Sequence, residues 1–208
     1  IADSYIKLGT YKKILIVCTE ANSTGMDMSD RGRHISVLFG DGAAAVVLGP
    51  SDKPGIRSTE LHADGRFAEE LMVPAPGCAY NPHLTHQILD EGLQYPVMNG
   101  KVVFVEAVTQ LTATILATLK ANNITIADID HFIPHQANMR INEAIGQKIG
   151  IDPAKVDHSI QRYGNCAAAS VPIALDEHVR AGKIKPGDTV LFATFAAGFT
   201  WGATLLDW

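Results

Sequence analysis

The sequence predicts an α/β protein in which helices pack in layers on mixed sheets. Short apolar segments typical of strands alternate with longer segments whose apolar residues recur at helical spacing. Two strand-like segments, residues 189–195 and 200–206, end the chain. Over 208 residues the composition is 47% hydrophobic and 19% charged, which is ordinary for a globular protein with a sizeable core.

Charge and cysteine content narrow the functional classes. The formal net charge is -5 and the sequence has no block of lysine or arginine, so a nucleic-acid partner has little support. The longest apolar runs, such as residues 43–48, are too short to cross a bilayer, and no membrane partner is expected. Three cysteines without paired spacing argue against a disulfide framework and a zinc site. We therefore expect no metal and a reducing, cytoplasmic location.

The first residues have the pattern of the end of an amphipathic helix. Ile1, Tyr5 and Leu8 fall at helical spacing, and Gly9 suits a helix C-terminus. Because no N-cap precedes Ile1, we expect a further segment N-terminal to it. The apolar run at residues 13–19 is typical of a buried strand.

A tight hairpin is predicted after a polar surface loop at residues 22–33. Apolar strands at 35–39 and 43–48 are joined through Gly40-Asp41-Gly42, and Asp-Gly is a strong turn signal. We interpret this turn as structural, with Asp41 bonding local backbone amides. Phosphate binding is disfavoured because the expected following helix is missing.

The remaining elements follow from periodicity and caps. Residues 104–122 form the clearest helix, closed by Asn122-Asn123. Its apolar stripe is Val105, Val108, Leu111, Thr112, Ile115 and Leu119. Thr125 and Asp128 resemble a capping box. The other predicted elements are strands at 56–63 and 131–134, a loop at 75–96, a helix at 138–149 ended by Gly150, a helix at 170–181 ended by Gly182, and a turn at 186–188.

Two segments place a polar side chain at the end of an element. They are Phe132-Ile133-Pro134-His135-Gln136-Ala137-Asn138 and Tyr163-Gly164-Asn165-Cys166-Ala167-Ala168-Ala169-Ser170. A neutral imidazole and a carboxamide can both donate hydrogen bonds to one oxygen that gains negative charge. Such a pair of donors, His135 and Asn165, suggests carbonyl or enolate chemistry.

At these residues the chain resembles the β-ketoacyl-acyl-carrier-protein synthase III family of thiolase-like condensing enzymes. The run from Pro134 to Asn138 matches the family signature residue by residue. The second segment usually reads Gly-Asn-Thr-Ser-Ala-Ala-Ser, so Cys166 and Ala167 replace a threonine and a serine. Hydrogen bonds made by those two hydroxyls would be lost.

The resemblance implies the fold and its division. The family fold is a five-layered αβαβα sandwich of two similar halves. Residues 91–208 would form the complete C-terminal half, and residues 1–90 the tail of the N-terminal half with connecting loops. The segment 195–202 resembles the family's closing turn, where the Ala197 amide would serve the oxyanion hole. Ala196 and Ala197 replace usual glycines, which would make a positive φ angle costly there.

The resemblance also implies substrates, namely coenzyme A thioesters, and no cofactor. Arg31 and Gly32 would lie beside the coenzyme A nucleotide, and Arg140 near the mouth that meets an acyl carrier protein. Phe104 and Asn138 would lie along the pantetheine arm, and Phe195 completes the predicted substrate-binding set. Arg31 and Arg140 could equally be solvated surface charges.

The family needs a nucleophilic cysteine that these residues do not supply. Cys18 lies in an apolar strand, Cys78 in a loop without an adjacent base, and Cys166 resembles a threonine substitute. The resemblance places the nucleophile upstream of Ile1, at the N-terminus of the helix whose end is residues 1–9. A helix N-terminus stabilises a thiolate.

The implied reaction is a decarboxylative Claisen condensation of a malonyl thioester with an acyl group on that cysteine, in fatty-acid or polyketide-type synthesis. The expected molecule is a homodimer that uses acyl-CoA and an acyl carrier protein. Three alternatives stay open: a condensing enzyme that joins acyl chains without decarboxylation or uses an aromatic starter, an acyltransferase to oxygen or nitrogen, and a non-catalytic partner subunit. The last has no chemical need for both His135 and Asn165.

Overall fold

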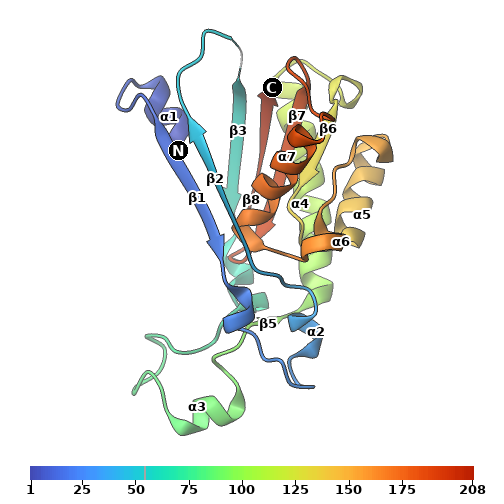
Figure 1. Ribbon diagram of the computed structural model, residues 1–208. Coiled ribbons are helices and arrows are strands. Elements are labelled where there is room, and N and C mark those ends of the chain that lie inside the picture. The colour runs from blue at the N-terminus through green and yellow to red at the C-terminus, as the bar shows by residue number, and fades with distance from the viewer. Residues whose placement is uncertain (54) are drawn as a thin grey trace.

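The protein, a computed structural model that describes residues 1–53 and 55–208, is built in layers (Figure 1). The largest layer is a mixed four-stranded sheet in the order β3-β8-β7-β6. β6 runs parallel to β7, while β7 pairs antiparallel with β8 and β8 with β3. Their bounds are β3 (Ile56–Ala63), β6 (His131–Pro134), β7 (Thr189–Ala196) and β8 (Thr200–Asp207).

Helices cover both faces of this sheet at β6 and β7, whose apolar side chains are buried on both sides. Phe132 and Leu191 point into a core shared with α4 (Gly100–Ala121) and α5 (Met139–Ile149). Their neighbours in the strands, Ile133 and Val190, point the other way and pack toward α7 (Ser170–Arg180). Helix α7 also contacts β2, so it lies between the four-stranded sheet and a second, smaller sheet (Figure 1).

The second sheet consists of two antiparallel strands, β1 (Ile14–Glu20) and β2 (Gly42–Leu48). The sequence predicts that β1 is buried, but Leu15 is 62% exposed and Val17 is 58% exposed. That prediction is wrong for the described residues, because nothing among them covers the outer side of β1. Helix α1 (Ala2–Lys7) precedes β1 and ends before Gly9, whose φ of +73° confirms the predicted helix end.

The predicted hairpin at residues 35–48 is wrong. Residues Arg33–Ser36 form a helical turn, α2, and β2 takes β1 as its partner. The apolar run 35–39 therefore does not make a strand, although Phe39 forms a single parallel bridge with Asn165. Tertiary contacts with the segment around Asn165 override the local strand pattern here.

Elements with caps or glycine stops are where the sequence predicts them. Gly150 and Gly182 end α5 and α7 with φ angles of +74° and +68°, and the capping box of Thr125 and Asp128 is present. Helix α4 begins four residues earlier than predicted, because Asn99 caps it. The predicted loop at 75–96 contains α3 (His86–Glu91), capped by Thr85. The remaining elements are β4 (Leu71–Met72), β5 (Val97–Met98), α6 (Ile160–Tyr163) and short 3-10 helices at Asn22–Thr24, Gly65–Glu70, Ile126–Asp128, Pro153–Lys155 and Ala167–Ala169.

Helix α4 is the central core helix. Eight of its residues are buried, among them Leu111, Ile115 and Leu119, whereas Val105 of the predicted stripe is 50% exposed. By length and composition α4 is also the one helix among the described residues that could cross a membrane, with a mean hydropathy of 1.7. A buried core helix meets the same criterion, so this is weak evidence for a membrane span.

The division of the chain at residues 90 and 91 stays a prediction. One observation bears on where the halves meet: β3 lies before that division, yet it pairs with β8 in the C-terminal sheet. Residues 1–90 therefore contribute a strand, β3, to the sheet that the later residues form.

Candidate active site

A pocket of about 380 Å³ lies where β6, β7, α4 and the residues preceding α7 meet. Its lining is mainly apolar, which suits an acyl or pantetheine chain. It brings together six of the nine residues predicted from the sequence: Phe104, His135, Asn138, Asn165, Phe195 and Ala197. Arg31, Gly32 and Arg140 do not line it.

His135 directly follows β6 and is held by the strand ladder. Its backbone N–H donates to the carbonyl of Ala193 on β7 at 2.8 Å, which extends the parallel pairing by one residue. Its Nδ1 lies 2.7 Å from Ser170 Oγ. Burial lowers the pKa of His135 to about 4, so the ring is neutral at physiological pH.

Asn165 is held by the segment that leads into β2. Its N–H donates to the carbonyl of Leu38 at 2.8 Å, and its carbonyl accepts from the N–H of Gly40 at 3.0 Å. Its side-chain Oδ1 accepts from the amide of Ala167 at 2.8 Å. Because the oxygen is engaged by the protein, Nδ2 is the part of the carboxamide left to donate to a pocket occupant.

Gly40 and Gly42 are required by close packing against this asparagine segment. A Cβ on Gly40 would lie 1.9 Å from the carbonyl oxygen of Tyr163, and one on Gly42 would lie 2.9 Å from Cys166 Cβ. The Asp41 carboxylate accepts from the amide and hydroxyl of Ser23, at 2.8 and 2.5 Å. The prediction of local amide partners is thus wrong: Asp41 ties β2 to the 3-10 turn 18 residues earlier.

Cys166 and Ala167, which replace a threonine and a serine, differ in whether a hydrogen-bond donor remains. Cys166 is buried, and its Sγ lies 3.3 Å from the carbonyl oxygens of Asp41 and Tyr163, so a weak donor remains where the sequence predicts a loss. Burial raises the pKa of this thiol, which disfavours the thiolate. Ala167 has a φ of +42°, an uncommon angle for a residue with a Cβ.

The turn between β7 and β8 accommodates its alanines. Neither Ala196 nor Ala197 has a positive φ angle. The positive angle in this turn is that of Gly198, at +131°. The predicted cost of a positive φ at these alanines is therefore not incurred. Phe195 lines the pocket and packs on Phe199, with ring centroids 4.8 Å apart.

Arg31 and Gly32 line a second pocket, of about 250 Å³, which shares Met98 with the first. Arg31 Nε lies 2.6 Å from Asp27 Oδ2, and its Nη1 donates to the carbonyl of Asp90 at 3.2 Å. Hydrogen bonds from Ser29 and Arg31 lower the pKa of Asp27 to about 2. A Cβ on Gly32 would lie 2.1 Å from the carbonyl oxygen of Asp27. Both residues thus have structural partners, and their coenzyme A role stays a prediction.

Arg140 lies on the surface in the first turn of α5. Its backbone N–H donates to Asn138 Oδ1 at 2.9 Å, so Asn138 caps the helix as well as lining the pocket. The Arg140 side chain is exposed. In residues 1–53 and 55–208 it has no carboxylate within ion-pair distance, which leaves its charge available to a partner.

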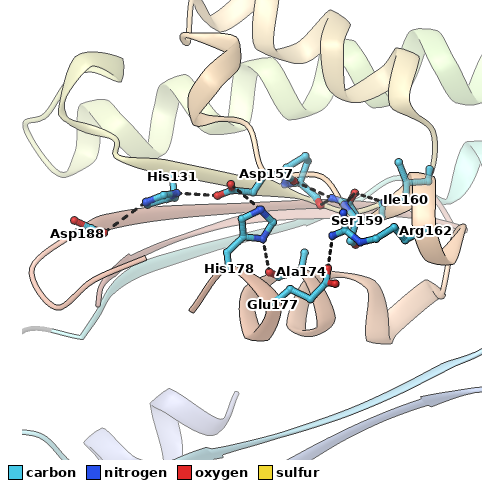
Figure 2. A network of polar contacts seen from close by, with 11 residues as sticks. His131, Asp157, Ser159, Ile160, Arg162, Ala174, Glu177, His178 and Asp188 are labelled. Atoms are coloured by element: carbon cyan, nitrogen blue, oxygen red, sulfur yellow. Dashed lines mark hydrogen bonds and ion pairs between the residues drawn. The ribbon is translucent and has the colours of Figure 1, made fainter. Parts of the chain in front are cut away.

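A network of polar contacts is centred on Asp157 (Figure 2), and it is joined by Gln136, the residue after His135. Asp157 Oδ2 lies 2.9 Å from His131 Nδ1, and Asp157 Oδ1 lies 3.1 Å from His178 Nε2. Gln136 joins this network to the site, since its Nε2 donates to the carbonyls of Pro134 and Asp157 and its Oε1 accepts from the amides of Ser159 and Ile160. The structural role of Gln136 and the contact of Ser170 with His135 were not anticipated from sequence, although both residues lie inside the two motifs.

Metal ligands are not grouped in the described part of the chain: no set of three or more His, Cys, Asp or Glu side chains there could hold an ion. The polar groups that line the pocket include the neutral imidazole of His135 and the carboxamide of Asn165, both of which can donate hydrogen bonds.

Two family models and many known proteins match this chain. The family model described as 3-oxoacyl-[acyl-carrier-protein (ACP)] synthase III matches residues 1–65, and its C-terminal counterpart matches residues 119–208. The β-ketoacyl-[acyl-carrier-protein] synthase III of Yersinia enterocolitica is 45% identical over 206 residues, and that of Sodalis glossinidius 45% over 207. These alignments cover 99% of this chain but 61% and 62% of the relatives, so the chain spans about three-fifths of their length.

Solved structures give the same result. The 3-oxoacyl-[acyl-carrier-protein] synthase III of Aquifex aeolicus superposes with a TM-score of 0.87 at 38% identity, over 100% of this chain and 61% of that one. The priming β-ketosynthase of the R1128 polyketide biosynthetic pathway superposes with a TM-score of 0.86 at 32% identity, over 99% and 60%. These matches confirm the thiolase-like fold and the family resemblance inferred from the motifs.

The low pKa of His135 predicts a specific pH dependence. In the folded protein the ring should titrate near pH 4, where an unperturbed ring titrates near 6.5. Between these values the unfolded state binds more protons, so the free energy of unfolding should decrease as pH falls, by about 3 kcal/mol from this group alone. Histidine NMR titration gives the midpoint, and denaturation of wild type and His135→Gln across this range gives the stability difference. A midpoint near 6.5 would contradict the assignment.

Proposed function

Because this chain belongs to the 3-oxoacyl-[acyl-carrier-protein] synthase III family, we propose that it supplies the enolate-stabilising part of a decarboxylative condensing enzyme. The observation that carries this proposal is the pair His135 and Asn165. Both line one apolar pocket, and each has one side-chain atom engaged by the protein, which leaves Nε2 and Nδ2 for a substrate.

In the proposed reaction, the thioester carbonyl oxygen of a malonyl group accepts hydrogen bonds from His135 and Asn165. The bond between the malonyl α-carbon and its carboxylate breaks, carbon dioxide leaves, and the electron pair moves into the enolate. Each donor stabilises that charge, and loss of one such donor typically slows a reaction by about 10²–10³-fold. A neutral imidazole suits this role because it still carries one N–H that can donate to the enolate oxygen. The apolar pocket keeps the ring neutral at physiological pH.

The enolate carbon then attacks an acyl group held on a cysteine. The new carbon–carbon bond produces a tetrahedral intermediate with an oxyanion. We propose that the backbone N–H of Ala197 donates a hydrogen bond to this oxyanion. Collapse of this intermediate expels the cysteine thiolate and releases the β-ketoacyl product. No metal or redox cofactor takes part in these steps. The chain is similar to a polyketide priming synthase and to β-ketoacyl-[acyl-carrier-protein] synthases III. The proposed reaction could therefore serve polyketide or fatty-acid synthesis.

We further propose that the cysteine belongs to a segment N-terminal to Ile1 and that the assembled protein is a cytoplasmic homodimer. The exposed apolar side chains of Leu15, Val17 and Val47 on β1 and β2 support a covering polypeptide. An exposed apolar sheet without a covering layer promotes aggregation.

The first test of the mechanism separates decarboxylation from acylation. His135→Ala and Asn165→Ala should each lower malonyl decarboxylation by about 10²–10³-fold, because each removes one enolate donor. Acylation of the cysteine by acyl-CoA should change little, since neither side chain is assigned to activating the nucleophile. His135→Gln keeps an N–H donor and should be partly active. Equal losses in both half-reactions would refute this division of roles, and radiolabelled acyl transfer measured beside carbon dioxide release distinguishes the outcomes.

A second test concerns the covering segment. The 208-residue chain expressed alone should bind a hydrophobic dye and self-associate, and co-expression with the preceding segment should suppress both effects. Light scattering and dye fluorescence measure this. A monodisperse chain without a second polypeptide would contradict the proposal.

A third test concerns the acyl carrier protein. Arg140→Glu should slow condensation with malonyl carrier protein far more at low than at high salt, because an acidic partner would meet a like charge. Turnover with malonyl-CoA should suffer less, since no protein docks. Lys148→Glu makes the same charge change at the far end of α5 and is the matched control. Equal, salt-independent losses with both substrates would instead place Arg140 in the substrate channel.

A further inference from the structure

We propose that Ser170 is a positioning residue that fixes the neutral tautomer of His135, so that the ring proton resides on Nε2. The inference rests on the proposed function, because it concerns how His135 becomes a hydrogen-bond donor to the substrate. It assigns a role to a serine at the start of α7 that does not itself reach the reacting atoms.

The hydroxyl of Ser170 has two neighbours. Its Oγ lies 2.7 Å from His135 Nδ1, and the backbone N–H of Gln136 donates to the same Oγ at 3.3 Å. Ser170 is 2% exposed, so water does not compete for these bonds. The Gln136 amide has no lone pair to offer, so the hydroxyl proton points to the nearby acceptor, Nδ1.

A neutral imidazole carries one proton, and its position decides the chemistry. If Nδ1 carried the proton, Nε2 would present a lone pair to the pocket and repel a thioester oxygen. When the Ser170 hydroxyl donates to Nδ1, that nitrogen is the acceptor and Nε2 carries the proton. The partner of one ring nitrogen thus determines what the other can do.

The same segment orients both donors. Asn165 and Ser170 stand at the two ends of the run that leads into α7, and Ala167 between them donates to Asn165 Oδ1 at 2.8 Å. The amide of Ala167 leaves Asn165 Nδ2 to donate, and the hydroxyl of Ser170 leaves His135 Nε2 to donate. Each contact engages the side-chain atom whose lone pair would repel an oxyanion, which is Oδ1 of Asn165 or Nδ1 of His135. The N–H group of each side chain is left for the pocket.

The experiment uses Ser170→Ala, Ser170→Cys and Ser170→Thr in the full-length protein labelled with ¹⁵N-histidine. In the Nε2–H tautomer, Nδ1 is the unprotonated nitrogen and resonates far downfield of Nε2. The wild type and Ser170→Thr should show this pattern for His135. Ser170→Ala and Ser170→Cys, which lack a strong donor, should show the two nitrogen shifts drawn together by mixing of tautomers. Cysteine is close to serine in size, so it reports on the donor if alanine disturbs packing.

Kinetics give the second measurement. Ser170→Ala should lower kcat for malonyl decarboxylation by about three- to tenfold, with little change in KM, as expected for loss of one hydrogen bond that orients a donor. Ser159→Ala removes a serine hydroxyl of equal burial that does not contact His135. Ser159 binds Gln136 through its backbone N–H, which alanine retains, so this variant should match the wild type.

Two results would overturn the proposal: an Nδ1–H pattern in the wild type, or an unchanged Nε2–H pattern in folded Ser170→Ala and Ser170→Cys. A tautomer that depends on Ser170 in a protein without decarboxylase activity would instead refute the proposed function and leave the tautomer assignment standing. The two proposals therefore fail separately.

Discussion

The site depends on a close backbone contact between residues 38–42 and 163–166. Asn165 exchanges hydrogen bonds with Leu38 and Gly40, and the absence of side chains on Gly40 and Gly42 lets the two segments approach within van der Waals distance. The first segment leads into β2 of the small sheet, and the second leads into α7, which packs on the large sheet. This contact therefore joins the two sheets at the pocket. It also fixes the backbone from which the Asn165 carboxamide projects, so that its Nδ2 needs little rearrangement to meet a substrate.

His135 is fixed from the opposite side by a different set of interactions. The parallel pairing of β6 with β7 continues through the His135 amide to Ala193, and buried Gln136 clips the end of β6 to residues 157–160. The Asp157 network with His131 and His178 supports that clip (Figure 2). Because strand and helix ends hold both side chains, folding orders them, and the proposed reaction would not have to order them again.

The sequence predicts those elements whose limits are set locally. Asn138 and Gly150 bound α5, Thr125 with Asp128 makes a capping box, and β7 and β8 follow from apolar runs around a turn. It mispredicts elements that depend on distant contacts. Residues 35–39 have a strand pattern, but the helical turn α2 ends within them at Ser36, and the residues after it, Leu38 and Phe39, offer their backbone to Asn165. Gly40-Asp41-Gly42 has the pattern of a hairpin turn, yet its glycines serve close packing and its aspartate binds Ser23. The apolar pattern of β1 predicts burial, yet Leu15 and Val17 are exposed in the described residues, because burial of a strand depends on which elements pack on it.

The sequence correctly places some of the predicted residues at the pocket and not others. The two groups differ in how many of their hydrogen-bonding atoms the protein already engages. His135 and Asn165 each have one atom bound by the protein and one left over, and the motifs mark both residues. Arg31 is marked by the same resemblance, but its guanidinium is engaged by Asp27 and by the carbonyl of Asp90, and it lines a separate pocket. A nucleotide phosphate at that pocket would have to share Arg31 with a carboxylate whose pKa of about 2 keeps it charged at physiological pH. Residue type and position on the chain identify the chemistry available, whereas only the folded contacts show how much of it is still free to act on a substrate.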